Sequence, residues 1–204
     1  MQPIFLLADS SLLFSNAAHG GALRDRIRSA VGDDDPSAAF LGEPEAVELF
    51  DAAMDALGIA KRRAIGARYS AMDDMCLRAA DLIVLGGGDL ARGWERVGAG
   101  DVKDAITRRY LEGAVLVGVS AGAILLGVGS EALRMVPFAI EAHAEEDDWR
   151  HLRTLVTEST IGIGIPFGAA AVYADGTLEP IGKPLVELRL KGSSVVESLL
   201  LPAL

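Results

Sequence analysis

Residues 114–126 carry the clearest signal of the fold and read Ala114-Val115-Leu116-Val117-Gly118-Val119-Ser120-Ala121-Gly122-Ala123-Ile124-Leu125-Leu126. Residues 114–117 are apolar and partly β-branched, which predicts a buried strand. Residues 121–126 are rich in Ala, Ile and Leu, which predicts the start of a helix. A Gly-x-Ser-x-Gly motif between strand and helix is typical of a nucleophile elbow, a sharp turn that exposes the serine hydroxyl. The alternative is an ordinary strand–helix connection in which Ser120 caps the helix.

The composition predicts one α/β domain without a nucleic-acid partner. The chain has 204 residues, enough for a single domain with a sizeable core, which we assign to residues 1–204. Half of the residues are hydrophobic and the mean hydropathy is +0.31, as expected for a parallel sheet covered on both faces. The net charge of -10 and the lack of a Lys/Arg stripe disfavour contact with a phosphate backbone.

The sequence favours the cytoplasm over a secreted or membrane location. Residues 1–9 lack a basic segment and include an acid, which predicts a first strand and not a signal peptide. The single cysteine, Cys76, excludes an internal disulfide framework. Residues 113–130 are all uncharged and reach the lower length limit for a transmembrane helix, but the predicted strand, turn and helix account for this run.

Apolar runs and helical patterns alternate along the chain as in βαβ units. Before the serine motif, strands are predicted at residues 4–8, 37–41, 61–66 and 81–85, helices at 23–31, 44–57, 72–79 and 102–112, and an acidic turn at 33–36. After it, strands are predicted at 137–142, 160–165, 170–174, 178–181, 185–190 and 195–200, and a helix at 147–156. Asp175-Gly176 predicts a hairpin between two of these strands.

A nucleophilic serine needs a base, and the chain has three histidines to supply one. His143 follows the strand predicted at 137–142, so we expect it at the carboxyl end of a strand. Ligands of open α/β sheets bind at that edge, and Ser120 opens onto it. His19 lies in a Gly-rich segment and His151 in a charged helix. We therefore predict His143 as the base, with a surface or capping histidine as the alternative.

Gly86-Gly87-Gly88 directly follows the strand predicted at 81–85. Backbone without side chains can approach a ligand closely and point its N–H groups at developing negative charge. The spacing does not match a phosphate-binding loop. We predict an oxyanion hole formed by the amides of Gly88 and Ala121, with a simple turn as the alternative.

Together, these segments resemble peptidase family S51, which includes the peptidase E aspartyl dipeptidases and the cyanophycinases and belongs to the class I glutamine amidotransferase-like fold. The resemblance rests on residues 81–89, 118–123, 133–143 and 161–172. It implies a flavodoxin-like three-layer α/β sandwich with a mostly parallel central sheet and a C-terminal β-hairpin region. It also implies a serine peptidase in which Ser120 attacks a short peptide and forms an acyl-enzyme.

The resemblance further implies that His143 transfers the proton and that Gly88 and Ala121 form the oxyanion hole. It leaves the acid of the triad open between two glutamates. Glu131 lies between serine and histidine, which is the order used by the family, and is preferred here. Glu145 lies two residues after His143, the His-x-Glu spacing of the glutamine amidotransferases. Either glutamate could instead be a solvated surface carboxylate.

Residues 145–148 read Glu-Glu-Asp-Asp where the aspartyl dipeptidases bring an arginine to their substrate. Since like charges repel, this loop disfavours an aspartyl substrate and favours small peptides with basic or neutral N-terminal residues. No metal or other cofactor is predicted. The sequence leaves the oligomeric state open, with a homodimer among the options.

Three alternatives compete with this interpretation. An α/β-hydrolase esterase would use His19-Gly20-Gly21 as its oxyanion loop and His151 with Asp147 as its base. A metal site could form from His143, Glu145, Asp147 and His151, although no metal-binding spacing supports it. The third alternative is a non-catalytic binding or regulatory protein of the same fold that has lost the full triad.

Overall fold

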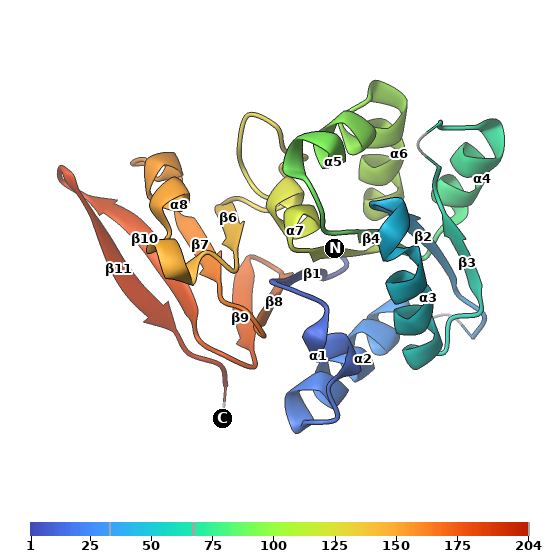
Figure 1. Cartoon of the computed structure of the whole chain (residues 1–204), viewed down its shortest axis with the longest axis horizontal. Coiled ribbons are helices and arrows are strands. Elements are labelled where there is room, and N and C mark those ends of the chain that lie inside the picture. The colour runs from blue at the N-terminus through green and yellow to red at the C-terminus, as the bar shows by residue number, and fades with distance from the viewer. Residues whose placement is uncertain (33, 67, 204) are drawn as a thin grey trace.

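The computed structural model describes residues 1–32, 34–66 and 68–203, which form a mixed α/β fold with two sheets (Figure 1). Strands of the large sheet lie in the order β3 (Lys61–Ala64), β2 (Ser37–Leu41), β4 (Leu82–Leu85), β5 (Val115–Val119), β1 (Ile4–Leu7), β8 (Ala170–Ala174) and β9 (Thr177–Ile181). The first five strands are parallel, and the β8–β9 hairpin adds antiparallel to β1. The predicted mostly parallel central sheet is confirmed.

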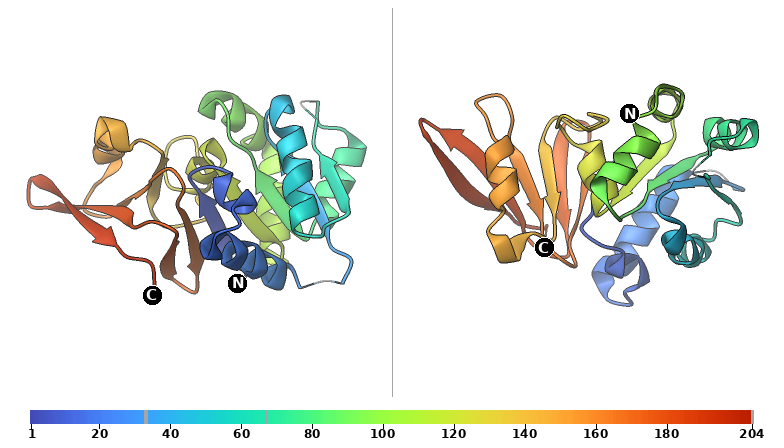
Figure 2. Two further views of the ribbon diagram at one scale, coloured as in Figure 1. Left: turned by 60° about the horizontal axis from the view of Figure 1, so that its bottom comes forward. Right: turned by 45° about the horizontal axis from the view of Figure 1, so that its top comes forward.

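Helices cover both faces of this sheet, because its central strands are apolar on both sides. In β1, Ile4 and Leu6 enter one apolar cluster while Phe5 and Leu7 enter another. The second cluster is covered by α1 (Ser11–Phe14), α2 (Ala18–Val31) and α3 (Val47–Ala56). The first is covered by α4 (Ala71–Ala79), α5 (Leu90–Val97), α6 (Gly100–Leu111) and α7 (Ala121–Leu126). The result is the expected three-layer sandwich (Figure 2).

The second sheet lies beside the β8–β9 hairpin and carries the C-terminal strands (Figure 1). Its order is β11 (Ser194–Leu200), β10 (Leu185–Lys191), β7 (Gly162–Ile165) and β6 (Ala139–Ala142), with β6 and β7 parallel. Trp149 and Leu152, the latter in α8 (Arg150–Leu155), cover one face. Ile140 and Ile163 on the other face join the apolar cluster of the large sheet. The two sheets therefore share a core.

Glycines in β7 explain how α8 approaches this sheet so closely. A Cβ at Gly164 would lie 2.7 Å from the Trp149 ring, and one at Gly162 would lie 2.9 Å from Leu152. The Gly-Ile-Gly-Ile sequence of β7 thus presents backbone to α8 and isoleucine to the shared core.

Most predicted elements are present within a few residues of their predicted ends, and the Asp175-Gly176 hairpin joins β8 to β9. The helix predicted at 44–57 divides into a 3₁₀ turn, η1 (Pro44–Ala46), and α3. The short helices α1 and α5 were not predicted. The turn predicted at 33–36 lies partly outside the described residues, since residue 33 is not described. Within the described ranges, none of the helices has both the length and the apolar character needed to span a bilayer.

Helix α2 begins at Ala18, so His19-Gly20-Gly21 is helical and the loop expected there is wrong. The helix predicted from residue 147 begins at Arg150, after a 3₁₀ turn, η2 (Glu145–Asp147). Asp148 and Trp149 separate the two because both have positive φ, which the α-helix does not allow.

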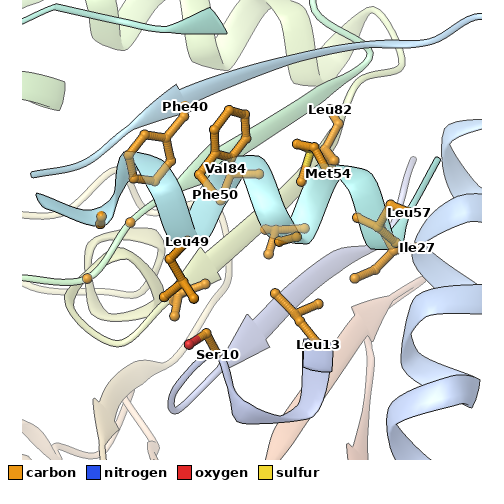
Figure 3. A pocket seen from close by; sticks show the side chains of 16 residues that line it. Ser10, Leu13, Ile27, Phe40, Leu49, Phe50, Met54, Leu57, Leu82 and Val84 are labelled. Carbon is orange, nitrogen blue, oxygen red and sulfur yellow. The ribbon is translucent and has the colours of Figure 1, made fainter. Parts of the chain in front are cut away.

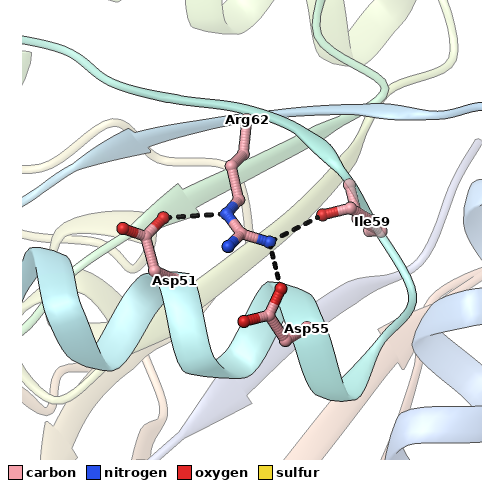
Figure 4. A network of polar contacts seen from close by, with 4 residues as sticks. All are labelled: Asp51, Asp55, Ile59 and Arg62. Carbon is pink, nitrogen blue, oxygen red and sulfur yellow. Dashed lines mark hydrogen bonds and ion pairs between the residues drawn. The ribbon is translucent and has the colours of Figure 1, made fainter.

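An arginine on the edge strand β3 fixes the position of α3 (Figure 4). Nε of Arg62 donates to Asp51 at 2.9 Å, and Nη1 donates to Asp55 and, at 3.2 Å, to the carbonyl of Ile59. The hydrogen bond with Asp55 raises the pKa of the Arg62 guanidinium above its usual value. These contacts with α3 therefore explain why the charged residue Arg62 stands in strand β3.

Candidate active site

Ser120 occupies a strained turn at the carboxyl end of β5. Its φ is 53° and its ψ is -117°, a backbone conformation that residues other than glycine rarely adopt. The Ser120 amide donates to the carbonyl of Leu7 at 2.9 Å, which continues the β1–β5 pairing to the turn, and α7 begins at the next residue. The predicted strand, turn and helix are confirmed.

The two glycines of the motif permit this turn because α7 packs directly against the sheet. A Cβ at Gly122 would lie 2.0 Å from the carbonyl oxygen of Leu85 in β4. A Cβ at Gly118 would lie 2.7 Å from the backbone of Ala123. Neither position can hold a side chain unless the backbone moves.

His143 directly follows β6 of the second sheet, and its ring reaches Ser120, which directly follows β5 of the large sheet. Its backbone has a φ of 44°, and its amide donates to the carbonyl of Ile165 at 2.9 Å. Oγ of Ser120 and Nε2 of His143 are 2.7 Å apart. The structure therefore brings together the serine and the histidine that the sequence singled out. Among the described residues, no group forms a hydrogen bond with Nδ1 of His143.

These two side chains line a cleft, here called the Ser120 cleft. It is formed by Ala8, Asp9, Ser10, Ala46, Leu49, Gly87, Val119, Ser120, His143, Glu145, Glu146 and Phe167. Gly87 closes one side, since a Cβ there would lie 3.2 Å from Cβ of Ser120. Gly88 follows with a φ of 130°. Among the described residues, no backbone hydrogen bond outside the helices and strands engages the amide of Gly88 or Ala121, and neither of these two residues is among those that line the Ser120 cleft.

The two candidate acids have different surroundings. Glu145 lines the Ser120 cleft, and its Oε1 accepts a hydrogen bond from the Phe167 amide at 2.9 Å. Glu131 is exposed, does not line the cleft, and forms no hydrogen bond or ion pair with the residues described. The structure thus places Glu145, and not Glu131, in the same cleft as Ser120 and His143.

Asp9 is a cleft residue that the sequence analysis missed. Its carboxylate accepts hydrogen bonds from the amides of Ser11 at 2.7 Å and Gly168 at 2.6 Å, which ties the end of β1 to the loop before β8. Its position after a central strand was a usable signal, since ligands of α/β sheets bind there. Leu49 and Phe167 gave no such signal, because only the tertiary fold brings α3 and the loop after β7 to the serine.

The proposed metal cluster does not form. His151 lies exposed on α8 and does not line the Ser120 cleft, unlike His143 and Glu145. In the part of the chain that the structure describes, no three His, Cys, Asp or Glu side chains are placed to hold a metal ion.

Comparison with sequence profiles of known protein families assigns the chain to one family. The sequence profile of peptidase family S51 matches residues 6–133, which is more than half of the chain and includes Gly86-Gly87-Gly88, Ser120 and Glu131. The chain belongs to peptidase family S51. Membership of S51 supports a peptidase, and therefore a hydrolase. A comparison with curated protein sequences finds no match.

Solved structures share the fold of this S51 chain. A peptidase from an acI-B1 Actinobacterium superposes with a TM-score of 0.71 at 17% sequence identity, with 99% of this chain and 95% of that chain covered. A putative peptidase E protein from Listeria monocytogenes EGD-e gives a TM-score of 0.63 at 16% identity, with 94% and 100% covered. At such identities the likeness concerns the fold. It extends beyond the S51 match to the second sheet, which carries His143.

The lining of the Ser120 cleft carries acidic side chains and no basic Lys or Arg side chain among the described residues. Asp9, Glu145 and Glu146 contribute three carboxylates. A substrate carboxylate entering the cleft would meet negative charge without a cationic partner.

Proposed function

We propose that this S51 chain is a serine peptidase that hydrolyses short peptides through an acyl-enzyme. The observation that carries the proposal is the 2.7 Å separation of Ser120 Oγ and His143 Nε2 within the Ser120 cleft. This distance lies in the range over which a base can remove a hydroxyl proton. The strained backbone of Ser120 supports its role as the nucleophile of a nucleophile elbow.

The reaction follows from these positions. Ser120 Oγ attacks the peptide carbonyl while Nε2 of His143 takes the hydroxyl proton. The amides of Gly88 and Ala121 stabilise the resulting oxyanion, and preorganised donors of this kind contribute roughly 10²–10³-fold to the rate. His143 then gives its proton to the leaving amine, and water attacks the acyl-enzyme to release the product.

We propose Glu145 as the orienting acid in place of Glu131. Its presence in the cleft and its distance of two residues from His143 support this role. Its carboxylate would have to turn from the Phe167 amide toward Nδ1 of His143, and catalytic hydrogen bonds often tighten only when substrate binds.

The cleft charges support a dipeptidase-like preference for substrates with a free amino terminus. Three carboxylates suit a cationic α-ammonium group and disfavour an aspartyl side chain.

The domain organisation and the location of the protein are also part of the proposal. The core shared by the two sheets supports one domain over residues 1–204. The unpaired Cys76 accords with a cytoplasmic location.

A labelling experiment separates this proposal from the alternative of a non-catalytic binding protein. The wild-type protein and the Ser120→Ala variant are treated with a fluorophosphonate and analysed by mass spectrometry, then screened against a dipeptide library. Ser130→Ala, at an exposed serine outside the cleft, is the matched control. Labelling and cleavage that disappear only in Ser120→Ala support the peptidase, whereas a wild-type protein that is neither labelled nor active favours the binding protein.

The acid is assigned by two further variants. Glu145→Gln is expected to lower kcat by about 10⁴-fold, as for removal of other triad acids, while Glu131→Gln keeps wild-type turnover. The opposite result would assign the role to Glu131. Full activity in both variants would show that neither glutamate is the orienting acid.

A further inference from the structure

An apolar pocket lies between α3 and the large sheet, next to the Ser120 cleft (Figure 3). We call it the α3 pocket. The sheet contributes Phe40 and Val84 to its lining, and α3 contributes Phe50 and Met54. The rings of Phe40 and Phe50 stack on each other, with their centroids 4.8 Å apart. Ser10 provides the one polar side chain in the described lining.

The α3 pocket and the Ser120 cleft meet at a common boundary. Five residues line both, namely Ser10, Ala46, Leu49, Gly87 and Val119. Gly87 places this boundary beside the nucleophile, because its missing Cβ would contact Ser120. A group held with its carbonyl at Ser120 Oγ can therefore direct a side chain past Gly87 and Leu49 toward α3.

The pocket is unsuited to water and to charge. Its volume is about 60 Å³, several times the space that one water requires, yet a buried water needs two to four polar partners. Ser10 and Gly87 lie at the boundary with the Ser120 cleft, and all other side chains of the described lining are apolar, so the interior offers no such set. A charged side chain entering it would lose its hydration without compensation.

We infer that the α3 pocket binds the side chain of the residue whose carbonyl Ser120 attacks, and that this side chain is apolar, of the size of leucine or methionine. This inference rests on the proposed peptidase function. Substrates are thus peptides with an apolar residue on the acyl side of the cleaved bond. The carboxylates of Asp9, Glu145 and Glu146 line the same cleft and would attract the α-ammonium group of such a residue.

Binding and turnover of three dipeptides test the inference separately. The ligands are Leu-Ala, Ala-Ala and Asp-Ala. Each buried methylene favours binding by roughly fourfold, and an isobutyl group adds three carbons to a methyl group, so Leu-Ala is expected to exceed Ala-Ala by about 10- to 60-fold. Calorimetry with the Ser120→Ala variant measures this preference in Kd without turnover, and kcat/KM of the wild-type protein measures it during catalysis.

Two pocket variants and a matched control locate the preference. Ala53→Leu fills the pocket from α3, where Ala53 is buried. Ala46→Leu narrows the mouth at a half-buried position that can take a larger side chain if the first variant fails to fold. Ala52→Leu makes the same change on the exposed side of α3, outside the pocket lining. The preference for Leu-Ala over Ala-Ala, measured as the ratio of their Kd values or of their kcat/KM values, is expected to approach one in a pocket variant. In the control it is expected to stay at the wild-type value.

The outcomes distinguish the two proposals. Equal Kd values for Leu-Ala and Ala-Ala, or tighter binding of Asp-Ala, overturn the apolar subsite even if Ser120 proves catalytic. A preference that survives both pocket variants also overturns it. Selective binding of Leu-Ala that is lost in a pocket variant supports the subsite, and if no peptide is hydrolysed it is the peptidase function that fails.

Discussion

The replacement of Gly122 by alanine tests whether packing of α7 against the sheet sets the serine turn. The new Cβ would lie 2.0 Å from the carbonyl oxygen of Leu85, and real Cβ atoms do not approach closer than about 3.0 Å. Helix α7 must therefore move by about 1 Å. Forced overpacking of this kind costs about 1–3 kcal/mol, which lowers Tm by roughly 2–12 °C in a chain of this size. Because Ser120 immediately precedes α7, its hydroxyl moves as well, and a displacement of about 1 Å can reduce a reaction rate by about 10²-fold.

Thermal unfolding measures the first effect, and the rate of fluorophosphonate labelling at Ser120 measures the second. Gly21→Ala is the matched control, since a Cβ at Gly21 in α2 would meet nothing within 4 Å. The control is expected to keep or slightly raise Tm, because alanine favours helix over glycine. A Gly122→Ala protein with the Tm and labelling rate of the wild type would refute the packing argument.

Three other predictions concern catalysis and stability. His143→Gln is expected to reduce Ser120 labelling by about 10²–10⁴-fold at unchanged Tm, and undiminished labelling would show that another base acts. The hydrogen bond from the Ser70 hydroxyl and the ion pair with Arg63 hold the pKa of Asp73 below its ordinary value. Asp73 therefore stabilises the fold above its unfolded pKa of about 3.9 and loses this effect as pH falls through the lower folded value. The Tm advantage of the wild type over Asp73→Asn should be full at pH 7 and should shrink steadily as pH falls below about 3.9. Arg62→Gln should lower Tm by removing both ion pairs to α3 (Figure 4), and no change in the melting curve would show that they contribute nothing.

Local sequence patterns were sufficient to predict the strands of the large sheet. Its central strands are continuous apolar runs because each faces a helical layer on either side, and such runs are recognisable without knowledge of their neighbours. The short helix α5 was missed because it spans only eight residues after the glycine run and buries only Val97. The start of α2 was missed because Gly20 and Gly21 favour a loop by propensity, whereas the helix packs Gly20 tightly against the carbonyl of Ser15.

The serine turn and the glycines that permit it could be predicted from local sequence, since residues 114–126 carry the strand, the turn and the helix within one segment. The sequence also indicated His143 through its position at the end of a strand. Three features depend on the packing of distant elements: Nε2 of His143 reaches Ser120, Glu145 and not Glu131 lines the same cleft, and an apolar pocket lies between α3 and the large sheet. These contacts join residues far apart in the chain, and they depend on how two sheets share a core, which no local pattern specifies.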